Sequence, residues 1–320
     1  MQPFNVFPHD STFDFMRLRL ASLVAAALLM VVALGAIPLK GFNFALDFTG
    51  GVGVELRYPQ APDVDGVRAR LAASGYEDAQ VQAFGSGNDL LVRLQADGKQ
   101  EGGADQASSI GDAVASAASL DGNPATKMSS AVISAQVGKE LAWNGFYALL
   151  FVVLGFLAYI SARFEWKFAV AAIITTLHDV LICAGWFALS GHEFDLTVLA
   201  GILSVMGYSI NDTIVVFDRV RENFKSLRVP PREVLNKSIN QTLSRTVITS
   251  FVALLTVLAL YFYGGGSLRG MAEAQMIGIV VGTLSSIFIA CPLLTMGFLT
   301  VTKQDLMPKA KDEAALARRP

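Results

Sequence analysis

Two carboxylates, Asp179 and Asp212, stand inside long apolar stretches of this 320-residue sequence, and neither stretch contains a lysine or an arginine. An ionised aspartate at the centre of a bilayer costs about 2.5–3.5 kcal/mol on insertion scales, so such groups usually face a helix-bundle interior or a wet cavity. There they commonly mark a path for ions or protons. The sequence therefore points to ion or proton movement, with Asp212 as the leading candidate.

Asp212 stands between Asn211 and Thr213, six residues before the expected end of its span at Asp218. At 1.5 Å per residue it would lie about 9 Å deep. Arg245 begins the next span, and antiparallel neighbours would bring its guanidinium to a similar depth. Burial favours the neutral carboxyl group whereas a nearby guanidinium favours the charged one, so movement of Arg245 could decide whether Asp212 holds a proton. A static ion pair between helices is the structural alternative.

His178 and Asp179 are adjacent in the middle of another apolar run and form the second candidate for the proton pathway. Neighbouring side chains on a helix point about 100° apart, so we do not expect these two to face each other as one pair. One of them could line the pathway. Hydrogen bonding between helices is the alternative role.

The sequence lacks the residues that bond-breaking catalysis needs. Ser209 and His178 could suggest a serine hydrolase, but Ser209 is followed by Ile210 and Asn211 rather than by a nucleophile-elbow glycine. A zinc protease needs a pair such as H-E-x-x-H, and the histidines stand only at positions 9, 178 and 192. We therefore expect no catalytic residue, no metal and no cofactor, with a proton or a sodium ion as the coupling ion.

The elements that hold these residues are predicted by an apolar composition. Hydrophobic residues make up 53% of the chain and charged residues 16%, and the mean hydropathy is +0.48. These values exclude a soluble enzyme or a disordered chain, and the formal charge of -2 lacks the basic excess of a nucleic-acid-binding protein. Six apolar runs each approach the ~20 residues that cross a hydrocarbon core. The fold class is therefore an α-helical polytopic membrane protein with six transmembrane helices, at residues 20–39, 141–160, 168–189, 196–217, 246–263 and 276–299.

Orientation follows from lysine and arginine, which are retained in cytoplasmic loops. Seven lie between residues 219 and 245 and five follow the last span, whereas the two short loops on the other side hold only Arg269. We expect a cytoplasmic N-terminus (1–19) and tail (300–320), and helices 2–6 within 141–299. The segment 219–245 places apolar residues on one helical face, which predicts an amphipathic helix on the inner leaflet.

The segment 40–140 between the first two spans reads as a folded outer domain. Alternating residues at 52–58 predict a strand, and residues 64–73 follow with helical spacing. Two short strand-like runs (81–84 and 90–94), an alanine-rich helix (108–120) and a last strand (127–137) complete the order. This β-α-β-β-α-β order is ferredoxin-like, and we expect the domain to bind rather than to catalyse.

Three stretches carry a resemblance to a known family. Residues 41–51 read Gly-Phe-Asn-Phe-Ala-Leu-Asp-Phe-Thr-Gly-Gly and include Asp47, Gly50 and Gly51. Residues 137–141 read Val-Gly-Lys-Glu-Leu, and residues 207–213 read Gly-Tyr-Ser-Ile-Asn-Asp-Thr. These motifs and the six-span layout resemble the SecF subunits of the bacterial protein-export machinery, within the resistance-nodulation-division superfamily of proton-driven exporters.

The resemblance implies a multi-pass protein of the bacterial inner membrane, with its large loop in the periplasm. It implies SecD as a partner, together with the SecYEG translocon, YajC and translocating preproteins. It also implies use of the proton-motive force in late translocation. Asp212 and Arg245 match the family positions of the proton path, for which SecD would supply a third carboxylate.

Two other functions remain open at this point. A six-span half of a lipid or small-molecule exporter from the same superfamily would share the membrane chemistry, although a larger outer region would be expected of it. A passive scaffold for the translocon would use the buried charges for structure alone.

Overall fold

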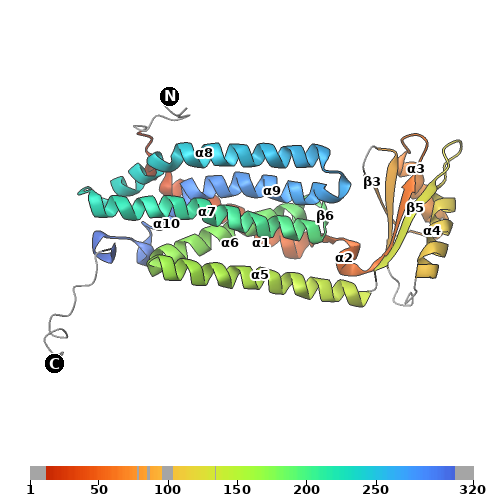
Figure 1. The fold of residues 1–320 in the computed structure, drawn as a ribbon, viewed down its shortest axis with the longest axis horizontal. Helices are drawn as coiled ribbons and strands as arrows, with labels where there is room; N and C mark the ends of the chain where they lie inside the picture. The colour runs from red at the N-terminus through yellow and green to blue at the C-terminus, as the bar shows by residue number, and fades with distance from the viewer. Residues whose placement is uncertain (1–11, 78, 85–86, 96–103, 134, 307–320) are drawn as a thin grey trace.

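A bundle of long helices carries a small α/β domain at one end in the computed structural model of the chain (Figure 1). The structure describes residues 12–77, 79–84, 87–95, 104–133 and 135–306. Residues 1–11 of the predicted N-terminal segment and residues 307–320 of the predicted tail therefore lie outside the described residues. Two short 3₁₀ turns, η1 (Phe15–Leu18) and η4 (Lys303–Leu306), mark the two ends of the described chain.

Six helices among the described residues are long and apolar enough to cross a membrane, which confirms the predicted six-span fold class. In chain order they are α1 (Arg19–Lys40), α5 (Ala135–Arg163), α6 (Trp166–Ser190), α7 (Leu196–Ser226), α8 (Pro231–Tyr263) and α9 (Gly266–Ser285).

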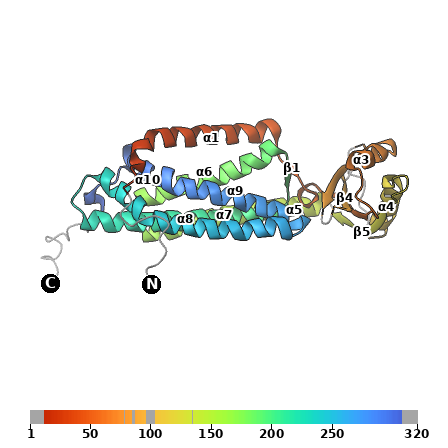
Figure 2. The same cartoon turned by 90° about the horizontal axis from the view of Figure 1, so that it is seen from above.

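The six helices are not equivalent. Half or more of the apolar windows of α6, α7 and α9 is buried inside the chain, whereas less than a fifth is buried in α1, α5 and α8. Figure 2 shows α1 along one side of the bundle. Because the central helices are screened from lipid by their neighbours, they can hold polar side chains at lower cost. Both intramembrane carboxylates lie on these central helices, on α6 and α7.

The last span begins earlier than the sequence predicts. The apolar run starts at Met276, but α9 already begins at Gly266 and accommodates Arg269 and Glu273 near its start. It then changes winding at a π-helical turn, η2 (Ser286–Ala290), and continues into the short helix α10 (Cys291–Leu293). Residues 297–299, predicted as the end of the span, form the separate 3₁₀ turn η3 (Gly297–Leu299).

The prediction that residues 219–245 form a separate amphipathic helix on the inner leaflet is wrong. Helix α7 continues through Ser226, and α8 begins at Pro231 and runs into the fifth span without a break. The apolar face of the segment, including Val234, Leu235 and Ile239, is buried in the core at this end of the bundle. Those residues therefore pack against protein rather than against lipid headgroups.

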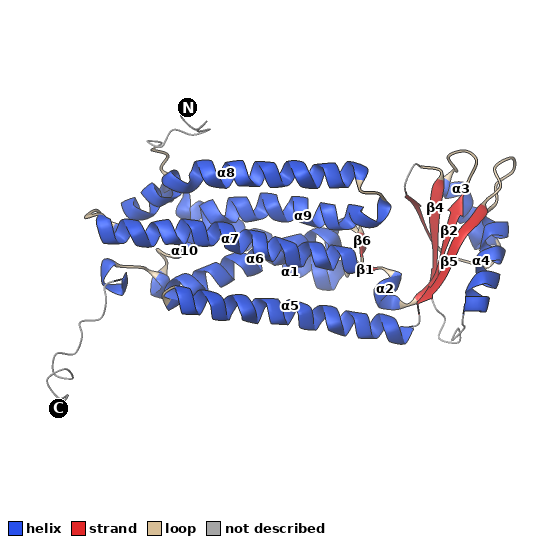
Figure 3. Ribbon diagram, viewed as in Figure 1, coloured by secondary structure: helices blue, strands red, loops and turns tan. Residues whose placement is uncertain are grey.

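The α/β domain has the predicted ferredoxin-like topology. Its elements are β2 (Gly51–Arg57), α3 (Val64–Ala73), β3 (Gln80–Phe84), β4 (Asp89–Gln95), α4 (Ala104–Ala118) and β5 (Thr126–Ile133). The strands form an antiparallel sheet in the order β3-β4-β2-β5. Alternate residues of β2, such as Val54 and Leu56, are buried with residues of α3 and α4 in one core. Figure 3 shows the sheet between the bundle and α4.

A small joint connects the domain to the bundle. The two-residue strand β1 (Asn43–Phe44) pairs in parallel with β6 (Glu193–Phe194), which precedes α7, and the one-turn helix α2 (Leu46–Thr49) follows β1. The rings of Phe42, Phe44 and Phe48 each lie within 6.0 Å of the Phe194 ring, measured between centroids. Backbone pairing and aromatic packing thus fix the domain beside the start of α7.

Candidate functional site

Asp212 is buried on α7 and is held by two hydroxyl groups. Its Oδ1 accepts a hydrogen bond from Thr246 Oγ1 of α8 at 2.9 Å, and its Oδ2 accepts one from Ser286 Oγ of η2 at 2.6 Å. The carboxylate therefore connects three elements of the bundle. Its partners are uncharged, so each can either donate to a carboxylate or accept from a carboxylic acid.

The predicted Asp212–Arg245 pair is not formed within the described chain. The Arg245 side chain is exposed on α8, and the next residue, Thr246, faces Asp212 in its place. Asn211 is exposed as well, whereas Thr213 is buried and its hydroxyl has no hydrogen-bond partner among the described residues. The contributions of Arg245, Asn211 and Thr213 to a proton path stay predictions.

Asp179 is fully buried on α6 and has three hydrogen-bond partners. Its Oδ2 accepts from Ser209 Oγ of α7 at 2.5 Å and from Ser285 Oγ of α9 at 2.7 Å. Its Oδ1 lies 3.0 Å from Nδ1 of His178. The expectation that these neighbours would not face each other is wrong. The backbone directs them apart, but rotation about the side-chain bonds brings the imidazole back to the carboxylate.

His178 leaves one polar atom without a partner. Its side chain is 7% exposed, and the buried Nε2 has no hydrogen-bond partner among the described residues. Because Nδ1 faces Asp179, Nε2 is the nitrogen that is left to form a hydrogen bond with another group. The imidazole and Asp179 thus form one polar unit at the centre of α6.

The sequence reasoning missed the hydroxyl partners of both carboxylates. Serine and threonine in apolar helices commonly bond to the carbonyl one turn earlier, so their types alone do not distinguish a ligand from a filler. The consecutive Ser285 and Ser286 in an otherwise apolar run were the available signal. Their place at the π turn was not readable from the pattern, although such turns are frequent at functional sites.

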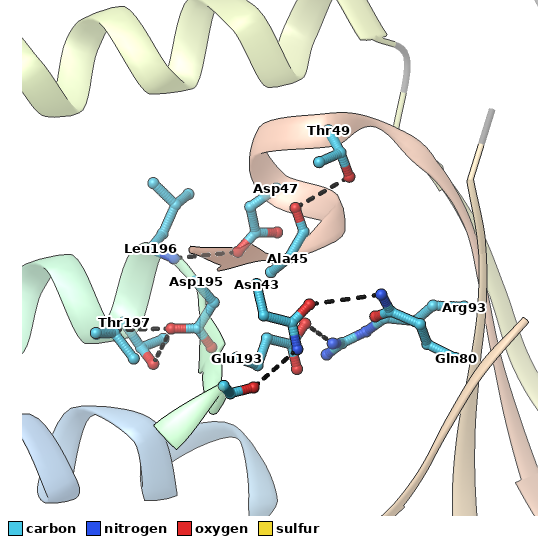
Figure 4. Close-up of polar contacts among 12 residues, drawn as sticks. Asn43, Ala45, Asp47, Thr49, Gln80, Arg93, Glu193, Asp195, Leu196 and Thr197 are labelled. Carbon is cyan, nitrogen blue, oxygen red and sulfur yellow. Dashed lines mark hydrogen bonds and ion pairs between the residues drawn. The ribbon is translucent and has the colours of Figure 1, made fainter. Parts of the chain in front are cut away.

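Asp47 lies in the joint between the domain and the bundle (Figure 4). Its Oδ2 accepts a hydrogen bond from the backbone N–H of Leu196, the first residue of α7, at 3.3 Å. Asp195 caps the same helix by accepting from Val198 N at 2.7 Å. Two carboxylates thus meet the positive end of the helix dipole, where negative charge is stabilised.

Gly50 and Gly51 are required by the shape of this joint. Their φ angles of +72° and +142° lie in the region that favours glycine. A Cβ on Gly51 would also run into the carbonyl oxygen of Leu94 and the side chain of Leu46. A Cβ on Gly138 of the neighbouring helix α5 would likewise lie 2.9 Å from the Phe48 carbonyl oxygen. Only glycine at these positions lets the chain leave α2 and enter β2 beside α5.

Charged and polar side chains complete the joint. Arg93 of β4 forms an ion pair with Glu193 of β6, and Asn43 Nδ2 donates to the Gly191 carbonyl at 3.1 Å. Burial lowers the pKa of Arg93 below its ordinary value, while the charges of Asp195 and Asp47 oppose that shift. The guanidinium remains protonated because arginine titrates far above neutral pH. These residues border a cleft of about 1400 Å³ between the open face of the sheet and the end of the bundle.

The described residues contain no group of three histidine, cysteine, aspartate or glutamate side chains that could hold a metal ion. The site therefore consists of two buried carboxylates, their hydroxyl partners and one histidine. Six membrane-spanning helices with such a centre, joined to a ferredoxin-like domain after the first helix, define a class of polytopic membrane transport proteins.

The comparisons with known proteins narrow this class. Residues 114–298 match the family model "Protein export membrane protein SecD/SecF, C-terminal", and residues 35–61 match "SecD/SecF GG Motif". The chain belongs to the SecF family of protein translocase subunits. The SecF subunit of Pseudomonas aeruginosa is 44% identical over 305 residues, which cover 94% of this chain and 96% of that protein. The SecF subunit of Escherichia coli O157:H7 is 38% identical over 287 residues, covering 88% and 86% respectively.

Solved structures agree with this assignment. The crystal structure of SecDF from Thermus thermophilus, described as a translocon-associated membrane protein, matches with a TM-score of 0.80 and 38% identity. A second structure, of SecDF in a super-membrane-facing form, matches with a TM-score of 0.68 and 39% identity. The first match covers 91% of this chain but 39% of the SecDF chain. The chain is therefore similar to less than half of that longer protein.

Proposed function

We propose that this chain joins a SecD partner and uses the proton-motive force to promote late protein translocation across the inner membrane. The single observation that carries the proposal is the pair of buried carboxylates on the central helices, Asp179 and Asp212, each of which accepts hydrogen bonds from neutral hydroxyl groups. The similarity to translocase subunits supports the protein-export role. In the complex, the SecYEG translocon, YajC and preprotein substrates would be further partners. The termini would be cytoplasmic and the α/β domain periplasmic.

Asp212 is the group to which we assign the exchange of the coupling ion. When it is ionised, Thr246 and Ser286 donate to its two oxygens. When it is protonated, its O–H can donate to one of these hydroxyls, which then turns its own proton elsewhere. Both states keep their hydrogen bonds, and a site that must gain and lose a proton needs this property. A permanently bonded arginine would favour the charged state alone.

Arg245 then has its role at the interface with the partner. Arg245 is exposed and is next to Thr246 in the sequence of α8. Most of the apolar stretch of α8 is not buried by the rest of this chain. A charge at this depth is costly in lipid, so the complex should cover it with an acidic or polar group. A SecD carboxylate would suit this position.

The decisive experiment replaces Asp212 with asparagine in vesicles that contain the complete complex. Asparagine keeps the shape and can still bond to Thr246 and Ser286, but it cannot take up a proton. We expect D212N to bind SecD normally and to lose export driven by the proton gradient. Ser204→Ala, an exposed position two turns earlier on α7, is the matched control and should export normally.

The outcomes distinguish the other functions. Export at the wild-type rate in D212N vesicles would contradict coupling and favour a passive scaffold. Recovery of the chain without a SecD-like partner would favour the half of an exporter. Repeating the assay with a sodium gradient in place of the proton gradient identifies the coupling ion.

A further inference from the structure

We infer that Ser285 and Ser286 join the two buried carboxylates into one unit, so that a proton gained or lost at Asp212 changes the bonding of Asp179. This inference rests on the proposed function, because it describes how its ion site is built. The two serines are consecutive, and each reaches a different carboxylate: Ser285 Oγ lies 2.7 Å from Asp179 Oδ2, and Ser286 Oγ lies 2.6 Å from Asp212 Oδ2.

The π turn makes this double contact possible. Ser285 is the last residue of α9 and Ser286 is the first of η2, so the change of winding falls between them. In this way neighbouring side chains bond to carboxylates on two different helices, α6 and α7. A π-helical turn inside an α-helix is rare and is frequently found at functional sites.

Close packing of α9 brings the short serine side chains within reach. A Cβ added to Gly278 would overlap the side chain of Val205 on α7. A Cβ added to Gly282 would lie 3.3 Å from the Ser209 Cβ and 3.7 Å from Asp179 Oδ2. Because both glycines lack side chains, α9 approaches α6 and α7 closely enough for hydroxyl groups, and not long side chains, to contact the carboxylates.

Each serine hydroxyl has two acceptors for its one proton. Ser286 Oγ lies 2.9 Å from the Thr283 carbonyl oxygen as well as beside Asp212, and Ser285 Oγ lies 3.0 Å from the Gly282 carbonyl oxygen. When a proton binds Asp212, the new O–H can donate to Ser286 Oγ, while the Ser286 proton turns to Thr283. When the proton leaves, the hydroxyl turns back. The carboxyl O–H is the one covalent bond that is made or broken in this step.

The coupling follows from the strength of these bonds. A hydrogen bond to an ionised carboxylate is roughly twice as strong as one between neutral groups. Protonation of Asp212 therefore weakens the hold on Ser286, and the π turn that carries Ser286 also positions Ser285 against Asp179. The bonding of Asp179 therefore changes with the protonation of Asp212.

Other ionisable groups of the described spans do not replace this connection. On α6, His178 bonds to Asp179 itself, and Cys183 Sγ lies 3.4 Å from the Ala274 carbonyl oxygen. On α8, the exposed Arg245 forms no ion pair with Asp212 within the described chain, although it is near enough for its positive charge to act on that carboxylate. At the domain end of α9, Glu273 bonds to Trp186 and His192.

Infrared difference spectroscopy after a pH change tests the coupling in the complete SecD-containing complex. The carbonyl bands of the two protonated carboxyl groups are assigned by their loss in D179N and D212N. We expect S286A to alter the Asp179 band as well as the Asp212 band, and S285A to alter the Asp212 band as well as the Asp179 band. Proton flux should fall severalfold in each variant, because each loses a hydrogen bond worth about 1 kcal/mol at a carboxyl group of the site.

Thr175→Val is the matched control. It removes a buried hydroxyl of α6 that bonds to the Ala171 carbonyl and not to a carboxylate, so both carboxyl bands should be unchanged. If S285A and S286A each alter only the band of their own carboxylate, the inference is overturned. If D212N exports at the wild-type rate, the proposed function fails instead, and the two failures are thereby distinguished.

Discussion

Asp47 of the GG motif accepts a hydrogen bond from the backbone N–H of Leu196, 149 residues further along the chain. Leu196 is the first residue of α7, and Asp212 lies sixteen residues further along that helix, about 24 Å at 1.5 Å per residue. The segment that leads into the α/β domain is therefore bonded directly to the helix that carries Asp212, the proposed ion-exchange residue. A rotation of the domain would act on α7 at its first turn.

We expect Asp47→Ala to loosen the first turn of α7. The lost cap is worth about 1 kcal/mol, so amide exchange at residues 196–198 should quicken by a few-fold to about tenfold. Hydrogen exchange measured by mass spectrometry on the purified complex reports this directly. Asp47→Asn should show a smaller effect because its amide oxygen can still accept the hydrogen bond. Glu77→Ala is the control, because it changes the charge of the domain at an exposed site. If α7 exchanges as fast in E77A as in D47A, the capping role of Asp47 is refuted.

Gly51→Ala should destabilise the α/β domain. The φ of +142° is strained for alanine at a cost of about 1–3 kcal/mol, and the new Cβ meets the Leu94 carbonyl oxygen as well. Because a domain of this size loses roughly 4–8 °C of Tm per kcal/mol, thermal unfolding detects the change easily. Gly155→Ala in α5 is the control, since nothing lies within 4 Å of its added Cβ. Equal melting temperatures for the two variants would show that the joint tolerates a side chain at position 51.

Tyr58 makes the domain sensitive to alkaline pH. Burial raises the pKa of Tyr58 to about 12, and its hydroxyl donates to the Ala118 carbonyl at 3.0 Å. Because the folded pKa lies above the unfolded value of about 10, this contribution to stability is complete below pH ~10 and is lost as the pH rises toward 12.

Absorbance titration of phenolate checks the Tyr58 prediction. The difference between wild type and Tyr58→Phe should give a transition near pH 12, which moves toward the ordinary tyrosine value when the domain is unfolded by denaturant. Tyr58→Phe should also cost about 1 kcal/mol for the lost hydrogen bond. A difference titration at the ordinary value in the folded protein would contradict the burial argument.

The spans and the α/β topology were predictable because burial sets a strict period. Val54 and Leu56 alternate along β2, and long runs without charge have few alternatives to crossing a membrane. The prediction of a membrane-surface helix at 219–245 is wrong because an apolar face such as that of Val234 and Ile239 does not specify whether lipid or protein covers it. The end of α9 was unpredictable for another reason: a π turn has no composition of its own.

The candidate site was predictable in its carboxylates but not in their partners. Charge in an apolar run identifies Asp179 and Asp212 directly. The face that each residue of α8 presents depends on the rotation of that helix, and one residue of difference places Thr246 rather than Arg245 against Asp212. The contact between His178 and Asp179 depends on rotamers, which no spacing rule contains.

Arg245→Lys should lower export driven by the proton gradient while leaving the chain folded. Lysine keeps the charge but loses the planar fork that binds a carboxylate through two hydrogen bonds, so the loss should be partial, and Arg245→Ala should cause a larger one. Export into vesicles and co-purification with SecD are measured together. Thr249→Ala, one turn away on the same exposed face, controls for general damage to that surface and should preserve both readouts. If lysine supports full export and alanine does not, charge alone is what the position requires. If both variants export normally, Arg245 has no part in the coupling, and the neutral hydroxyls around Asp212 suffice for it.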